Sequence, residues 1–197
     1  MARSTKMIDK LENSPAKILV DFHVDPERGF LPAQDPIEQL PAYYTQWEQM
    51  VTNLPMLLTA NRARVMLKRL PVLAVNHLER DEQVERAMLL LSIFASAYVW
   101  EQKIPKTHIP HNLAEPLWAV AEMLERPPIL SYTSIVLHNW RRLEQVNLLN
   151  LENLALQHCF WGGIDEQWFY LISAAIEAAG GACFASFGHS PASCCEQ

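Results

Sequence analysis

A run of 14 residues from Ala87 to Trp100 is apolar around most of a helical circumference, and it constrains the fold more than any other feature. Charged residues lie on both sides of the run, and Asp81 and Glu82 precede it at the positive end of a helix dipole. A bilayer-spanning helix needs about 20 apolar residues, so this segment is too short to cross a membrane. The pattern therefore predicts a buried helix over residues 81–101 with other helices packed around it.

Apolar residues at spacings of three and four predict helices in most of the remaining chain. The expected helices cover residues 35–54 (with Asp35 and Pro36 at the N-cap and first position), 61–70, 112–124 (capped by Asn112), 129–143 and 165–179 (capped by Asp165). Tyr132, Ile135, Val136 and Asn139 are expected on one face of the fourth helix. Residues 17–24 are the one expected strand, residues 144–163 look irregular, and Gly180-Gly181 should end the last helix. The fold class is therefore mainly α, with a minor β element near the N-terminus.

Composition limits the environment and the partners of the chain. Of its 197 residues, 50% are hydrophobic and 19% are charged, enough apolar area for a compact core. A net charge of −6 leaves no basic face for phosphates, so we expect no nucleic-acid partner. We also expect no membrane association, because neither a membrane span nor a secretory signal is found. Four cysteines without a Cys-x-x-Cys pair favour a reducing compartment, and we expect a cytoplasmic protein.

The usual motifs of nucleotide, phosphate and metalloprotease chemistry are absent from the sequence. His108 and His111 are three residues apart, but Pro110 between them favours a loop over a metal site. Near the C-terminus lie four possible zinc ligands, Cys183, His189, Cys194 and Cys195, although adjacent cysteines suit a tetrahedral site poorly. Acidic pairs such as Asp165 and Glu166 are typical of first helical turns. A zinc-binding tail therefore stays a minor alternative.

Several short motifs are more informative when they are read in order between residues 28 and 180. They are Gly29-Phe30-Leu31-Pro32, Leu54-Pro55, Leu70-Pro71, Ala97-Tyr98-Val99-Trp100, Asn112-Leu113-Ala114, Pro127-Pro128-Ile129-Leu130-Ser131-Tyr132, Val136-Leu137-His138-Asn139-Trp140, Gly162-Gly163 and Trp168-Phe169-Tyr170-Leu171-Ile172-Ser173 with Glu177. This order resembles the N-terminal region of the indoleamine 2,3-dioxygenases and the helix that opens their large domain.

The resemblance implies a haem b enzyme of the kynurenine pathway. Members of this family add both atoms of O₂ across the C2–C3 bond of an indole and convert L-tryptophan, or a related indoleamine, to N-formylkynurenine. By the same resemblance, Tyr132 matches an aromatic position of the distal pocket, and Ile135 and Val136 match its apolar lining. Phe169 matches the aromatic residue beside the indole, and Ser173 the hydroxyl near the bound oxygen.

The resemblance also implies a domain organisation. Residues 1–16 are expected to form a flexible arm, 17–155 a small helical cap domain, 156–182 the first helix of the large haem domain, and 183–197 an irregular cysteine-rich tail. In the family the axial histidine lies far along the large domain, and no histidine of this chain matches it. We therefore expect no metal ligand in this chain and a truncated form that is inactive alone. The alternative is a non-catalytic interaction module, in which a protein partner covers the exposed face of helix 165–180.

Overall fold

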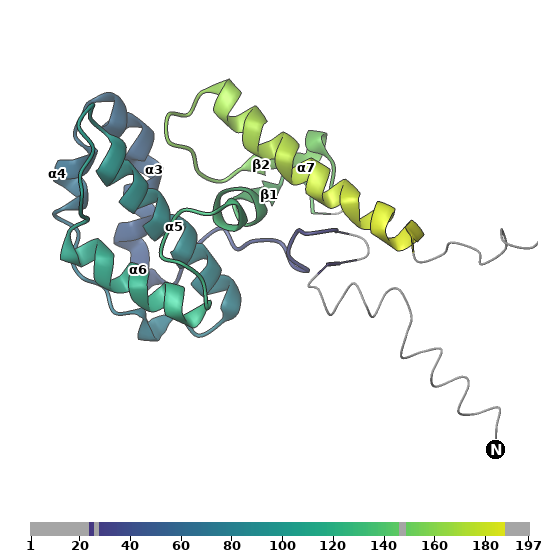
Figure 1. Ribbon diagram of the computed structural model, residues 1–197, viewed down its shortest axis with the longest axis horizontal. Coiled ribbons are helices and arrows are strands. Elements are labelled where there is room, and N and C mark those ends of the chain that lie inside the picture. The colour runs from purple at the N-terminus through teal and green to yellow at the C-terminus, as the bar shows by residue number, and fades with distance from the viewer. Residues whose placement is uncertain (1–23, 26–27, 146–148, 188–197) are drawn as a thin grey trace, which may run out of the picture.

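The computed structural model describes residues 24–25, 28–145 and 149–187, with side chains described as far as Gly181 (Figure 1). The elements in chain order are η1 (Ala42–Tyr44), α3 (Thr45–Thr59), α4 (Ala63–Leu67), η2 (Val75–His77), α5 (Asp81–Trp100), α6 (His111–Met123), η3 (Thr133–Leu137), β1 (Trp140–Arg142), η4 (Leu151–Asn153), β2 (Leu154–Leu156) and α7 (Ile164–Phe187). The predicted fold class is confirmed, because the described chain is mainly helical with one small antiparallel sheet of two strands.

Helix α5 is the centre of the core, as its sequence predicts. It packs against α3, α4 and α6, and all four side chains from Met88 to Leu91 are fully buried. Four consecutive residues cover a full helical turn, so their burial requires neighbours on every side. Among the described residues, no helix is both long enough and apolar enough to cross a membrane.

The first predicted helix begins later than expected. Residues 35–41 are not helical, and η1 and α3 start at Ala42 and Thr45. The Asp35 carboxylate accepts hydrogen bonds from the guanidinium groups of Arg28 and Arg142 instead of capping a helix. Pro55 lies inside α3, which continues to Thr59 because the buried Leu54 and Leu58 hold both sides of the proline against the core.

The predicted cap of the helix expected at 112–124 is also wrong. Helix α6 has Pro110 at its N-cap, and Asn112 lies inside the first turn. The Asn112 amide donates instead to the backbone carbonyls of Leu67 and Leu70, at 2.9 and 2.8 Å. Its role is to satisfy the carbonyl groups at the end of α4, which a helix leaves without partners.

Residues 129–143 do not form the expected helix. The segment contains one π-helical turn, η3, followed by β1, which pairs with β2 in the register Trp140↔Leu156, Arg141↔Ala155 and Arg142↔Leu154. Asn139 extends this pairing, since its side chain bonds both the N–H and the carbonyl of His158. The pairing of β1 with β2, which lies in a segment expected to be irregular, therefore replaces the end of the predicted helix. The expected strand at 17–24 lies outside the described residues except for Val24, and Asp25 forms an isolated bridge with Gly29.

Helix α7 continues through Gly180-Gly181 to Phe187, so the predicted end at 179 and an irregular chain from 183 are both wrong. Both glycines lie inside the helix, and the absence of a side chain at Gly181 makes room for the N-terminal turn. A Cβ on Gly181 would lie 2.5 Å from the Gly29 nitrogen, and Gly29 itself has a φ of +62°. Asp25, Arg28 and Gly29 therefore lie directly against the backbone of α7. The remainder of the predicted tail, 188–197, lies outside the described residues.

Candidate functional site

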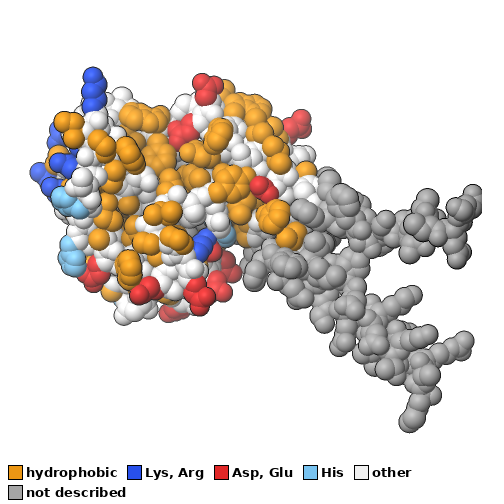
Figure 2. Space-filling model, in the orientation of Figure 1, with side chains coloured by type: hydrophobic (Ala, Val, Ile, Leu, Met, Phe, Trp, Pro, Cys, Tyr) orange, Lys and Arg blue, Asp and Glu red, His pale blue; other side chains and the backbone are white. Residues whose placement is uncertain are grey.

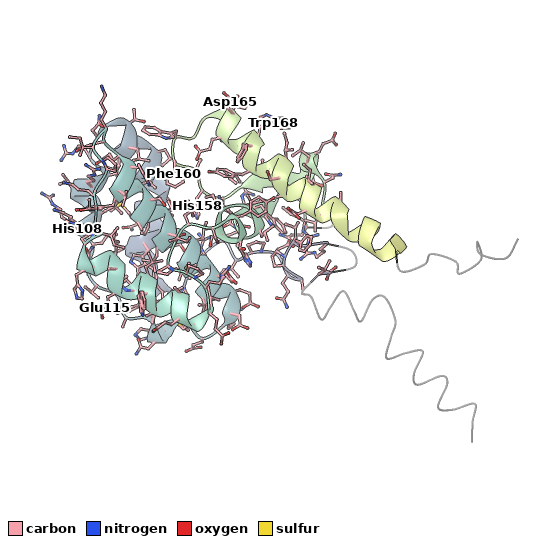
Figure 3. All side chains as sticks on the ribbon, viewed as in Figure 1. His108, Glu115, His158, Phe160, Asp165 and Trp168 are labelled. Atoms are coloured by element: carbon pink, nitrogen blue, oxygen red, sulfur yellow. The ribbon has the colours of Figure 1, made fainter. Side chains whose placement is uncertain are left out.

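One side of α7 is open and mostly apolar. Its exposed residues Phe169, Ile172 and Ile176, the partly buried Ser173 between them, and Tyr132 just before η3 are called the α7 face below. Phe169 is 68% exposed and Tyr132 is 50% exposed. Hydrophobic side chains gather on the surface where α7 lies, and Trp168 projects near the N-terminal end of the same helix (Figures 2 and 3). Exposed aromatic and aliphatic side chains that gather in one place often mark a binding surface.

The start of α7 is held by an acidic side chain one residue after the predicted one. The Glu166 carboxylate accepts hydrogen bonds from the backbone N–H groups of Phe160, Trp161 and Gly162, at 2.6, 2.8 and 3.1 Å. These bonds fold the preceding loop back onto the first turn. The opposite side of α7 packs against η3 and β2, with Ala174 and Ala178 buried. The α7 face is therefore fixed in orientation by the helix beneath it.

Tyr132, Ser173 and Glu177 come together at one edge of the α7 face. The Tyr132 hydroxyl donates to Glu177 Oε1 at 2.8 Å, and the Ser173 hydroxyl donates to the Phe169 carbonyl oxygen at 2.8 Å. Partial burial raises the pKa of Tyr132; the hydrogen bond to Glu177 and its charge also raise it, while the nearby Ser173 hydroxyl acts in the opposite direction. Tyr132 is therefore a neutral donor at physiological pH.

The five predicted site residues occupy two environments. Tyr132, Phe169 and Ser173 share the open α7 face, as one wall of a pocket would. Ile135 and Val136 are 7% and 2% exposed and belong to the hydrophobic core, on the π-helical turn against which α7 packs. Their assignment to the pocket lining stays a prediction. Glu177 was named in the sequence motif, but no role was predicted for it. Its spacing of four residues from Ser173 could have indicated that the two side chains lie on adjacent turns of one helix face.

The described histidines have places away from the α7 face. His111 pairs with Glu115 on α6, and His108 lies in the preceding loop beside Thr107 (Figure 3). His138 is near Glu85, and His158 contacts the Arg86 guanidinium at 3.2 Å. Nowhere in the described ranges do three His, Cys, Asp or Glu side chains gather as a metal site would require. The proposed zinc ligands of the tail lie outside the described residues, apart from the backbone of Cys183.

The α7 face fits one side of a haem pocket. Aromatic and aliphatic side chains with two hydroxyls suit the distal side of a haem, where an indole and O₂ must meet. A haem iron also needs an axial donor on its other side, and no described histidine is placed on the α7 face. Among the described residues, the α7 face is therefore compatible with one wall of such a pocket, and it carries no histidine that could serve as the axial ligand.

A buried polar cluster lies apart from this face. The Arg86 side chain is 4% exposed, and its guanidinium donates to both Glu48 carboxylate oxygens, the Gln157 side chain and the Ile37 carbonyl. It lines two cavities, of about 380 and 540 Å³. Through Glu48 and Gln157, Arg86 ties α5 to α3 and to the segment after β2.

Comparisons with known proteins agree with the resemblance noted in the sequence. The family profile of indoleamine 2,3-dioxygenase matches residues 18–193. The indoleamine 2,3-dioxygenase of Saccharomyces cerevisiae is 32% identical over 187 residues, which cover 90% of this chain and 41% of the yeast protein. Indoleamine 2,3-dioxygenase acdA of Aspergillus candidus is 37% identical, over 83% of this chain and 42% of that protein. Indoleamine 2,3-dioxygenase 1 of rat is 35% identical, over 83% and 40%.

The chain thus spans about two fifths of the length of these curated relatives. The matched range includes the core helices, the π-helical turn and α7. This chain belongs to the indoleamine 2,3-dioxygenase family.

Proposed function

We propose that this chain supplies the small-domain part and one wall of the substrate pocket of a cytoplasmic haem dioxygenase. The reaction is the opening of the indole ring of L-tryptophan, or of a related indoleamine, by O₂ to give N-formylkynurenine. The observation that carries the proposal is the α7 face, on which Tyr132, Phe169 and Ser173 converge. Ring-substituted substrates fall within the proposal, because one relative is a 6-hydroxytryptophan 2,3-dioxygenase of Fusarium equiseti.

The chemistry of the α7 face suits the binding of an indole. Phe169 offers an exposed ring for stacking, and Ile172 and Ile176 extend the apolar surface beside it. Ser173 is the hydroxyl at the centre of the face, one helical turn from Phe169; it donates to the Phe169 carbonyl oxygen, so its oxygen can accept a hydrogen bond from a bound ligand. A bound haem would supply the activation of O₂. The protein residues orient the ring, exclude water and limit the number of proton donors.

The axial histidine is proposed to lie in the C-terminal part of the family's proteins, which this chain does not cover, and the 197-residue chain alone is then expected to be inactive. Five-coordinate ferrous haem requires such a ligand before it can bind O₂. The described part of the chain provides the distal wall only, so any haem bound by it alone would remain open to water on one side.

The test compares this chain with a chimera in which residues after Gly181 are replaced by the corresponding C-terminal region of the rat relative. The chimera is expected to bind hemin with a shifted Soret band and, after reduction, to form N-formylkynurenine from L-tryptophan and O₂. Phe169→Ala and Ser173→Ala should each lower kcat/KM about tenfold or more, equivalent to about 1.4 kcal/mol or more of lost transition-state stabilisation. Trp118→Ala, an exposed aromatic on α6, is the matched control and should have no effect.

A haem-loaded, folded chimera that forms no product would refute the proposed reaction. Equal kcat/KM for the wild type and both α7 variants would instead show that the α7 face is not the pocket wall.

A second candidate is a non-catalytic interaction module, and it is favoured by the same exposed helix. Ile164, Trp168 and Ile176 are all largely exposed along α7. A contiguous apolar stripe of this kind suits an amphipathic helix of a protein partner. This reading needs no haem, and it predicts self-association or binding of a partner by the chain itself.

A further inference from the structure

The surface around α4 and the C-terminal end of α5 carries an excess of positive charge. Residues 62–70 and 100–108 together contain six Lys or Arg residues and one Glu, a net charge of +5 in a chain of −6. Five of these cations are exposed, and within the described ranges none of the five has a carboxylate oxygen within 4.0 Å. They are called the basic end below and are Arg62, Lys68, Arg69, Lys103 and Lys106.

The basic end was not expected from the composition. Figure 2 shows Lys and Arg side chains gathered on the side of the molecule where α4 lies. The expectation that a net charge of −6 leaves no basic face is therefore wrong for this end of the molecule. The average hides it because the acidic residues lie elsewhere in the chain.

Hydrogen bonds of Arg64 and Glu101 hold the two segments of the basic end together. The Arg64 side chain is buried, and its guanidinium donates to the carbonyl oxygens of Val99 at 2.8 Å and Ile104 at 3.2 Å. The Glu101 carboxylate accepts from two backbone N–H groups at the start of α4. The Lys106 N–H donates to the Val99 carbonyl oxygen at 3.1 Å, so the loop after α5 returns to the helix. The basic end is therefore one surface with a defined shape.

Two large apolar side chains lie among these cations. Trp100 is 69% exposed and Ile104 is 81% exposed, on either side of Lys103 in the chain. Tryptophan and aliphatic side chains flanked by lysines suit the interface of a bilayer, where the apolar groups reach the acyl boundary and the cations stay at the phosphates. Nucleic acid would gain little from Ile104, because bases stack on aromatic rings. The combination favours a lipid surface.

The acidic remainder of the chain lies too far away to cancel this attraction. Asp81 and Glu82 begin α5, and its 20 residues span about 30 Å between them and the basic end. At physiological ionic strength charges are screened over about 8 Å. Glu115 is nearest in the chain among the acidic residues of α6, and its single charge leaves a large positive excess.

The basic end is also separate from the α7 face. Helix α4 packs mainly against α5 and α3, whereas α7 packs mainly against β2 and η3 (Figure 1). His108, beside the basic end, and Trp168, on α7, lie well apart in Figure 3. A ligand or polypeptide that covers the α7 face would therefore leave the basic end accessible.

We propose that the basic end binds the surface of an anionic phospholipid membrane, with Trp100 and Ile104 at the interface. The cytoplasmic leaflet offers such lipids to a cytoplasmic protein. Peripheral binding needs no spanning helix, so it agrees with the length of α5 and replaces the expectation of no membrane association. It requires neither haem nor an indole, and it is independent of the proposed function.

The test is flotation of the full 197-residue chain with two kinds of vesicle, pure phosphatidylcholine and an equal mixture of phosphatidylcholine and phosphatidylserine. The chain should bind the mixed vesicles about tenfold or more tightly than the neutral ones, because each lysine or arginine near an anionic surface adds to the affinity. High salt should remove most of this difference. The neutral vesicles control for adhesion through the α7 face, which does not depend on lipid charge.

Lys103→Ala and Lys106→Ala should each lower the partition coefficient on mixed vesicles about fivefold, the equivalent of about 1 kcal/mol per lysine. Arg141→Ala removes one cation from β1, away from the basic end, and is the control for net charge. Trp100→Ala should also lower the coefficient severalfold, whereas Trp161→Ala, at a site of similar exposure before α7, should not. Circular dichroism verifies that each variant is folded.

Equal binding to the two kinds of vesicle would overturn the inference, and so would an equal loss of binding in Arg141→Ala and the lysine variants. The chain is also titrated with poly(dT) and with poly-L-glutamate. If it binds either polyanion but not the mixed vesicles, the basic end recognises nucleic acid or an acidic protein segment instead, and the lipid assignment is refuted.

Discussion

Replacement of Gly29 by alanine is expected to detach the N-terminal turn from α7. Gly29 has a φ of +62°, and in this left-handed region a residue with a Cβ costs about 1–2 kcal/mol. A Cβ would also overlap the backbone carbonyl oxygen of Glu177, which cannot move aside as a side chain can. Overpacking costs about 1–3 kcal/mol. The sum, about 2–5 kcal/mol, is a large share of the about 5–15 kcal/mol by which a folded protein is stable.

Three other glycines separate these two contributions. Gly162 has a φ of +73° with its nearest neighbour at 3.8 Å, so Gly162→Ala should cost only the strain, about 1–2 kcal/mol. Gly181 lacks a positive φ but would place its Cβ 2.5 Å from the Gly29 nitrogen. Its overlap of about 1–3 kcal/mol is partly offset by the about 1 kcal/mol that alanine gains in a helix. Gly163 has open space around it, so Gly163→Ala should change stability by less than about 1 kcal/mol.

Urea unfolding followed by circular dichroism would give the free energies of unfolding for the four variants. Hydrogen exchange would show whether Gly29→Ala opens only the turn, with faster exchange at the Asp25 and residue-29 N–H groups, each of which normally donates to the other residue's carbonyl oxygen. If only the turn opens, the free energy of global unfolding should change less, but the faster amide exchange at the turn should remain. The reasoning fails if Gly29→Ala matches Gly163→Ala in both measurements.

Three further predictions concern the core, its pH dependence and the exposed helix. Arg86→Leu should destabilise the fold by about 3–5 kcal/mol in urea unfolding, because it leaves the partly buried Glu48 carboxylate without its cation; a change below 1 kcal/mol would contradict this. Burial, together with the charge of Arg86, lowers the pKa of His158 from 6.5 to about 3. Between these values the unfolded chain binds a proton that the folded chain does not, so the free energy of unfolding should fall by about 1.4 kcal/mol per pH unit as pH falls from 6.5 towards 3. His158→Gln should reduce this dependence of the free energy of unfolding on pH, and an unchanged dependence would refute the assignment. The chain should associate with increasing concentration in analytical ultracentrifugation, and Trp168→Ser should weaken this association; a monomer at every concentration would argue against an apolar docking face.

Local patterns predicted the elements whose stability depends on their own apolar faces. The α5 helix was predicted at 81–101 and lies at Asp81–Trp100, because no alternative buries so many consecutive apolar side chains. The predictions failed where a distant partner decides the outcome. Asp35 looks like an N-cap, but its carboxylate is bound by Arg28 and by Arg142, which is 107 residues away. No local spacing contains that information.

The candidate site was predictable in composition but not in shape. Motif resemblance identified Tyr132, Phe169 and Ser173, and the structure brings them to one open face. The helical period expected for 129–143 would have placed Tyr132 beside Ile135, Val136 and Asn139, all of which are buried. The π-helical turn changes that period, and the pairing of β1 with β2 ends it. Tyr132 is thereby left at the surface, within reach of Glu177.

The misread glycines explain how the N-terminal turn and the candidate site are connected. A Gly-Gly pair usually indicates a break in a helix, yet here it allows α7 to run past the turn at 25–29 with backbone against backbone. Gly29 lies against the main chain of Glu177, whose side chain holds the Tyr132 hydroxyl. A displacement of the turn would therefore move the carboxylate and the phenol ring together. Gly29→Ala should then lower the kcat/KM of the haem-loaded chimera although Gly29 lies outside the α7 face, whereas the equally strained Gly162→Ala, at the other end of α7, should lower it less.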